Sequence, residues 1–195
     1  MRWRLGYKLL AHESFVSRTR QVDHTGMLTG RLSLAAGLLV VAACHNAPHQ
    51  PQAAWWYDIE FAPDAASVRG ISVSSMMPEW RSARDLTDRE VQDRISRSEF
   101  QNFKASPFAF NTTADLNRDG SAEDFFVGVF KASDGSTGRF AAVTKNHTVL
   151  KVFQERGKPG FSALLKIGDA VRWYKCMDCG EFETITWTGT SYLLE

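Results

Sequence analysis

The segment "DFFVGVFK" (residues 124–131) decides the fold class, because the six residues from Phe125 to Phe130 carry apolar side chains or, at Gly128, none. Side chains alternate between the two faces of a strand, so this run is apolar on both faces. Strands of that kind are buried on both sides. We therefore predict that this segment is a central strand of a sheet.

Strand-length apolar runs continue on both sides of this segment, and turn residues separate them. Seven further runs fit this description: "FAFNTTA" (108–114), "RFAAVTK" (139–145), "TVLKVFQ" (148–154), "FSALLKI" (161–167), "AVRWYKC" (170–176), "EFETITW" (181–187) and "SYLLE" (191–195). The connections, such as "RGKPG" (156–160), which we interpret as a hairpin turn, are too short for parallel crossovers. The pattern predicts an antiparallel β-meander of about seven to eight strands.

One amphipathic helix is expected before the meander. In "LTDREVQDRI" (86–95), Thr87 can cap the first backbone amides while Glu90 reaches back, as in a capping box. Val91 and Ile95 lie one helical turn apart, which continues an apolar stripe. The sequence predicts a single helix over 88–101.

The segments "WWYDIEF" (55–61) and "VRGISVSSM" (68–76) are rich in aromatic and β-branched residues, which favours short strands. Residues 55–195 are therefore expected to form one β-rich α+β domain.

An appendage precedes this domain. The chain has 195 residues, and "LSLAAGLLVVAA" (32–43) is an uncharged run that follows Arg31 and ends at Cys44. It is shorter than the roughly 20 apolar residues that a membrane-spanning helix needs. Its length suits the apolar core of a signal peptide, so export is expected.

Val41, Ala42, Ala43 and Cys44 resemble the lipobox of bacterial lipoproteins. The resemblance implies cleavage before Cys44, acylation of that cysteine and permanent anchoring of the mature chain in a membrane. His45 in the following position implies sorting to the outer membrane, with the folded part facing the periplasm.

These features divide the chain into a signal, a tether and the folded domain of residues 55–195. Residues 1–43 are expected to form the lipoprotein signal, either with its true start at Met27 or with residues 1–26 as a long basic n-region. Residues 44–54, "CHNAPHQPQAA", are expected to be a flexible tether.

The charge of the remainder excludes one class of partner. Residues 1–43 carry six basic and two acidic residues of the 23 and 22 in the chain, which leaves the mature part with a net charge near −3. Nucleic-acid binding requires a basic face, and the sequence shows none.

The acidic stretch "ADLNRDGSAEDFF" (114–126) has the spacing of a calcium loop. Calcium takes oxygen ligands from alternating residues of a tight loop, with glycine at the sixth position. Gly120 occupies that position. The candidate ligands are Asp115, Asn117, Asp119, the carbonyl of Ser121, and Glu123 or Asp124.

Phe126 stands where an EF-hand requires a bidentate glutamate, so the loop is not an EF-hand. The string resembles the D-x-N-x-D-G calcium loops of integrin-type propeller repeats and dockerin-like modules, which implies a ligand role for these residues and a structural ion. The motif occurs once, so a propeller is excluded. The alternative is a plain turn, in which Asn117 and Asp119 bond their own backbone.

Cys176 and Cys179 form a C-x-x-C pair between two strand-like runs. A tetrahedral zinc site needs four ligands, and a thioredoxin-like motif needs a β-α-β setting. In an oxidising envelope a local disulfide that pins a hairpin is expected. Free thiols, or metal or redox chemistry at this pair, remain the alternatives.

No string of the chain carries a nucleophile-elbow pattern or another catalytic constellation. The sequence therefore predicts a non-catalytic binding or structural module, stabilised by calcium, whose partner is an envelope protein or a cell-wall component. One alternative is a periplasmic enzyme-inhibitor or immunity lipoprotein. Another is a thiol-disulfide or metal-dependent envelope enzyme that uses the cysteine pair.

Overall fold

The computed structural model describes residues 54–195, all of which fall within one compact unit. The predicted signal (1–43), Cys44 and the tether up to residue 53 lie outside the described residues. Within residues 54–195, none of the helices combines the length and the apolar character that spanning a bilayer requires.

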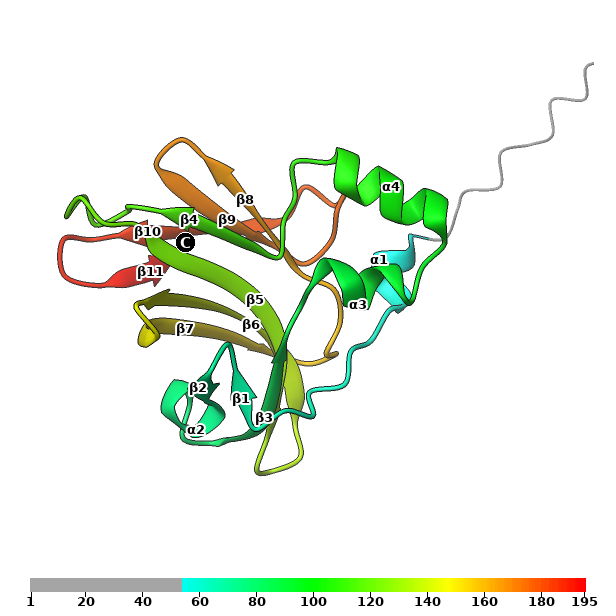
Figure 1. Cartoon of the computed structure of the whole chain (residues 1–195), viewed down its shortest axis with the longest axis horizontal. Coiled ribbons are helices and arrows are strands. Elements are labelled where there is room, and N and C mark those ends of the chain that lie inside the picture. The colour runs from blue at the N-terminus through cyan, green and yellow to red at the C-terminus, as the bar shows by residue number, and fades with distance from the viewer. Residues whose placement is uncertain (1–53) are drawn as a thin grey trace, which may run out of the picture. The chain divides into compact units, whose positions relative to one another are not determined.

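The first sheet is antiparallel and has β5 at its centre (Figure 1). Its strands are β3 (Trp80–Asp85), β4 (Asn111–Ala114), β5 (Glu123–Ala132), β6 (Thr137–Lys145) and β7 (Thr148–Arg156). β6 lies along one edge of β5, and β4 and β3 share the other edge, β4 beside the first half and β3 beside the second. The prediction that 124–131 is a central strand is confirmed.

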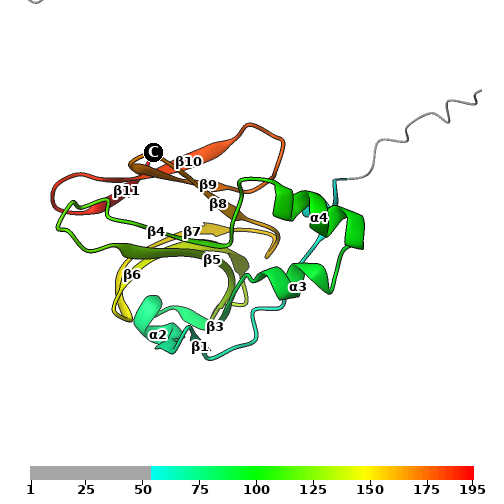
Figure 2. The same ribbon diagram turned by 45° about the horizontal axis from the view of Figure 1, so that its top comes forward.

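The second sheet is also antiparallel and has the order β11-β10-β9-β8. Its strands are β8 (Ala163–Ile167), β9 (Ala170–Tyr174), β10 (Phe182–Trp187) and β11 (Tyr192–Leu194). Figure 2 shows this sheet lying over the first, with two helices at one end of the pair. An isolated bridge between Ala109 and Leu164 links the two sheets.

The core has two parts because β5 is apolar on both faces. Its odd-numbered residues, such as Phe125 and Val127, pack in the larger cluster with Trp173 and Ile185 of the second sheet. Its even-numbered residues pack in a smaller cluster on the other face. That cluster is covered by β1 (Ser67–Val68), β2 (Ile71–Ser72) and α2 (Val73–Met76).

The remaining helices are α1 (Trp55–Asp58), α3 (Asp88–Gln92) and α4 (Arg97–Ala105). The prediction of one helix over 88–101 is wrong, because the chain leaves the helix after Gln92 and starts again at Ser96. Ser96 and Glu99 form the capping box that was expected nine residues earlier, at Thr87 and Glu90. Thr87 does cap α3, but the carboxylate of Glu90 binds Arg84 at 2.6 Å.

The α+β class and all eight strands expected from residue 108 onward are confirmed. The strand expected over 55–61 is instead the helix α1, whose Trp55 packs edge-on against Phe161. The segment 68–76 divides into a short hairpin and α2. "RGKPG" is not a hairpin turn, because β7 and β8 belong to different sheets.

Candidate metal site

The acidic loop joins β4 to β5, at the end of the two sheets opposite to α3 and α4 (Figure 1). The pairing of Ala114 with Glu123 closes the loop at its base. Residues 115–122 are therefore held as a short connection whose two ends are fixed by the sheet.

Asp115 organises the backbone of this loop. Its Oδ1 accepts a hydrogen bond from the amide of Asp119 at 3.1 Å, and its Oδ2 accepts one from the amide of Gly120 at 2.9 Å. Gly120 has a φ of 85°, in the left-handed region that glycine adopts without strain. The chain thus curls around the carboxylate of Asp115.

Asn117 and Asp119 continue the same turn. The amide of Asp119 also donates to Asn117 Oδ1 at 3.0 Å, and the amide of Ser121 donates to Asp119 Oδ1 at 3.0 Å. These are the bonds of successive Asx turns. A calcium loop and a plain turn share them, so they do not separate the two interpretations.

Glu123 has an environment that a turn does not require. Its side chain is fully buried. Its Oε2 accepts a hydrogen bond from the amide of Leu116 at 3.0 Å, and its Oε1 has no hydrogen-bond partner among the described residues. Oxygen atoms of Asp115, Asp119 and Glu123 lie within 4.8 Å of one another.

Lys145, at the end of β6, is the cation nearest to this cluster. Its Nζ donates to Asp119 Oδ2 at 2.6 Å and lies 3.9 Å from Glu123 Oε1, beyond hydrogen-bond distance. The bond to Asp119 raises the pKa of Lys145, and the same bond lowers the pKa of Asp119. One ammonium therefore faces three carboxylates.

Tyr192 of β11 closes the cluster on the side of the second sheet. Its hydroxyl is buried and has no hydrogen-bond partner among residues 54–195. Burial raises the pKa of this phenol most, and the Glu123 carboxylate raises it further through its charge and its closeness to the phenol oxygen, although the two groups fall short of good hydrogen-bond geometry. Neither residue is apparent from the sequence, because Lys145 comes near the loop through the pairing of β5 with β6, and Tyr192 through the packing of the second sheet on the first.

The structure separates Asp124 from the other candidate ligands. Asp124 is an even-numbered residue of β5 and faces the side of the smaller core cluster, whereas Glu123 faces the larger one. Asp124 lines a different, open cavity of about 680 Å³ with Arg69 and His147. The structure thus brings Asp115, Asp119 and Glu123 together, with Asn117 and Ser121 in the same loop.

This arrangement offers only oxygen ligands to an ion. Asp115, Asp119 and Glu123 supply carboxylates, and Asn117 and the Ser121 carbonyl are neighbouring acceptors. Carboxylate and carbonyl oxygens suit a hard divalent cation. The donor set fits calcium, and it contains no thiolate or imidazole for a softer metal.

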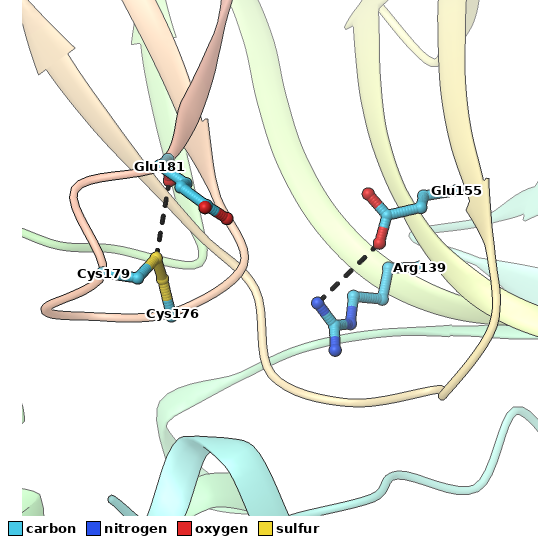
Figure 3. Close-up of a disulfide and its surroundings, with 5 residues drawn as sticks. All are labelled: Arg139, Glu155, Cys176, Cys179 and Glu181. Carbon is cyan, nitrogen blue, oxygen red and sulfur yellow. Dashed lines mark hydrogen bonds and ion pairs between the residues drawn. A yellow bond between two sulfur atoms is a disulfide. The ribbon is translucent and has the colours of Figure 1, made fainter.

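The cysteine pair lies between β9 and β10 (Figure 3). The sulfur atoms of Cys176 and Cys179 are within bonding distance, and Cys176 is buried. The turn between the strands is therefore closed just beyond the Tyr174–Phe182 pair. A disulfide that pins a hairpin remains the interpretation of this pair.

No protein-family model, curated protein or solved structure matches the chain. Inferences about function therefore rest on the sequence motifs and on the geometry of the site.

Proposed function

We propose that this chain is a membrane-anchored envelope lipoprotein whose folded part is a non-catalytic binding module stabilised by calcium. Calcium is bound by the β4–β5 loop through Asp115, Asn117, Asp119, the Ser121 carbonyl and Glu123. The anchor is the acylated Cys44. The partner is an envelope protein or a cell-wall component on the periplasmic side of the outer membrane.

The buried carboxylate of Glu123 carries the calcium proposal. Moving a charged group from water into a protein interior costs roughly several kcal/mol unless a partner compensates the charge. Glu123 is fully buried, and its Oε1 has no hydrogen bond within residues 54–195. An ion at the oxygen cluster would supply the missing partner.

The plain-turn alternative does not account for Glu123. Asx turns explain why Asp115, Asn117 and Asp119 accept backbone hydrogen bonds. Glu123 is the first residue of β5 and lies outside those turns. In a turn that binds no ion, we would expect the position of Glu123 to hold an apolar residue or a solvent-exposed one.

Lys145 gives the site a moderate affinity rather than a high one. A calcium ion must displace the ammonium from Asp119, to which it is hydrogen-bonded at 2.6 Å. Extracellular calcium modules bind with dissociation constants of roughly 10⁻⁴ to 10⁻³ M. An affinity in that range keeps the site filled outside the cytoplasm.

Calcium titration of the purified protein, by calorimetry and thermal unfolding, tests the site. Saturation at about ten times the dissociation constant stabilises by roughly 1.4 kcal/mol, which raises Tm by about 3–6 °C for a chain of this size. Glu123→Gln keeps the acceptor for the Leu116 amide but removes the buried charge. This variant should lose the calcium response and should be at least as stable as the wild type without calcium.

Asp124→Asn is the matched control, because it removes the same charge one residue away on the other face of β5. It should keep the wild-type calcium affinity. Equal midpoints for the wild type in calcium and in chelator would contradict the proposal, as would an equal loss of affinity in the two variants.

The anchor is tested separately by mass spectrometry of the native protein from its own membranes. The expected N-terminal peptide begins at Cys44 and carries acyl chains, and Cys44→Ala should release the protein into the soluble fraction. An unmodified Cys44 in a protein recovered from the cytosol would overturn the envelope assignment.

A further inference from the structure

A second feature, Arg139, lies six positions before Lys145 on β6, which places it about 20 Å along the strand from that end of the sheet. Its side chain is only 16% exposed and points between the two sheets. The Nε atom of the guanidinium is buried and has no hydrogen-bond partner among the described residues. Buried polar groups are normally hydrogen-bonded, and the described residues supply no acceptor for this Nε atom.

The carboxylate nearest to Arg139 is committed elsewhere. Glu155, directly opposite on β7, has its Oε1 at 4.0 Å from Arg139, which is too far for a hydrogen bond. The Oε2 of Glu155 forms an ion pair with Lys175 at 3.2 Å, and Lys175 is also bonded to Glu183. Two carboxylates thus surround Lys175, whereas Arg139 has only the long 4.0 Å ion pair with Glu155, without a hydrogen bond to its buried Nε.

Gly160 preserves the space around the guanidinium. A Cβ atom added at Gly160 would lie 3.1 Å from Nη2 of Arg139, tighter than an ordinary contact. Burial lowers the pKa of Arg139, and only the charge of Glu155 opposes this effect. A negative charge in direct contact with this guanidinium would therefore be favourable.

Arg139 faces a cavity of about 410 Å³. Figure 3 shows its guanidinium extending toward the loop that carries Cys176 and Cys179. The cavity wall also contains two aromatic side chains, Tyr57 and Phe182, both largely exposed. The cavity is thus a cleft with one weakly paired cation, two aromatic side chains and a wall formed by the cysteine loop.

We infer that this cavity binds a small monocarboxylate with an apolar substituent, whose carboxylate pairs with Arg139 and whose apolar part contacts Tyr57 and Phe182. A planar guanidinium matches a carboxylate through two parallel hydrogen bonds. The acidic side chains of Glu155, Glu181 and Glu183 outnumber Arg139 and Lys175 in the lining. A doubly charged phosphate would therefore meet more repulsion than a singly charged carboxylate.

Calorimetric titration with phenylacetate tests this inference. Phenylacetamide has nearly the same shape without the charge, acetate lacks the ring, and inorganic phosphate carries more charge. Phenylacetate should bind at least tenfold more tightly than each of the other three. No measurable binding of phenylacetate, equal binding of the amide, or tighter binding of phosphate would overturn the inference.

Substitution of Arg139 tests which group carries the binding. Arg139→Met keeps an unbranched side chain without charge and should weaken phenylacetate binding at least tenfold. Arg156→Met is the control, because Arg156 lies on the neighbouring strand β7, pairs with Asp134 at 2.8 Å and does not line the cavity. Wild-type affinity in Arg139→Met would contradict the inference.

Arg139→Lys provides a second variant in case the methionine variant does not fold, because it keeps the charge but loses the planar fork. It should bind phenylacetate at least fivefold more weakly than the wild type, and unchanged affinity would count against the site. Calcium binding to these variants should remain normal. The two sites can therefore fail or succeed independently.

Discussion

At the scale of single residues, the contrast between Glu123 and Asp124 shows what strand geometry adds to a motif. The loop spacing allowed either residue to complete a calcium site. β5 begins at Glu123, and alternation directs this side chain toward the larger core cluster and Asp124 toward the other face. Because β5 is apolar on both faces, the sequence pattern could not assign the faces in advance.

Lys145 and Tyr192 show which site residues a local sequence motif does not identify. Both are far from the acidic loop in the sequence, and no local motif connects them to it. Lys145 arrives through the pairing of β5 with β6, and Tyr192 arrives because the second sheet covers the first. Contacts of this kind depend on register and packing, which a single sequence does not reveal.

Gly128 gives a prediction at this scale. A Cβ atom there would lie 2.3 Å from the carbonyl oxygen of Arg84 and 2.4 Å from the ring of Phe140. Gly128→Ala should therefore cost about 3 kcal/mol of unfolding free energy or more, since a packed sheet cannot make room cheaply. Urea denaturation of the purified protein measures this loss.

Gly135→Ala is the matched control for Gly128→Ala. Gly135 has a φ of 85° and nothing within 4 Å of the added Cβ. Its substitution should cost only about 1–2 kcal/mol, from the left-handed backbone. A smaller loss for Gly128→Ala than for Gly135→Ala would show that the contacts around Gly128 are looser than described.

At the scale of elements, strands defined by apolar runs between turn residues were predictable, whereas β3 was not. The segment "WRSARD" (80–85) reads as polar, yet it pairs with the second half of β5. Only Trp80 and Ala83 of this strand are buried, so its burial pattern is too sparse for a periodicity signal. β3 forms a strand because the second half of β5 has an edge whose backbone groups β3 can hydrogen-bond.

The helices show the same dependence on context. Of the expected apolar stripe, Val91 lies in α3 and packs in the larger cluster, whereas Ile95 lies in the break between α3 and α4 and packs against the same cluster. The stripe did not reveal the break between α3 and α4. Ser96 and Glu99 mark the second start as clearly as Thr87 marks the first, since each begins with a side-chain cap.

The capping box of α4 gives a prediction for this scale. The Ser96 hydroxyl accepts from the amide of Glu99 at 3.3 Å, and the Glu99 carboxylate accepts from the amide of Ser96 at 2.9 Å. Ser96→Ala should lower the unfolding free energy by about 1 kcal/mol. Ser98→Ala, inside the same first turn, should change it by less than about 0.5 kcal/mol.

Denaturant unfolding of both serine variants measures the difference. Equal losses would indicate that the serine hydroxyls act through each other, at their 3.1 Å separation, rather than through the cap.

At the scale of the whole molecule, the α+β class and the antiparallel connections followed from the sequence, but the division into two sheets did not. "RGKPG" looks like any other turn of the meander, and here it carries the chain from the first sheet to the second. The division into two sheets depends on which apolar faces of the first sheet must be buried. The odd-numbered face of β5 requires an apolar layer, and β8 to β11 supply it.

The two-sheet arrangement also places the two candidate sites. The acidic loop lies near the end of β6 that carries Lys145, and the Arg139 cavity lies toward the other end, lined by Tyr57 of α1 and by the cysteine loop. Each contains a buried charge that the described chain leaves without a full set of partners. We propose that the first of these charges, on Glu123, is compensated by a bound calcium ion.

A crystal structure of the protein grown in millimolar calcium would show whether an ion lies against Glu123. We predict an anomalous density peak at calcium-to-oxygen distances of about 2.3–2.6 Å from Asp115, Asp119 and Glu123. The ammonium of Lys145 should have moved away from Asp119. A map with no peak, in which Lys145 still bonds Asp119 and a water molecule pairs with Glu123 Oε1, would show that calcium does not compensate Glu123.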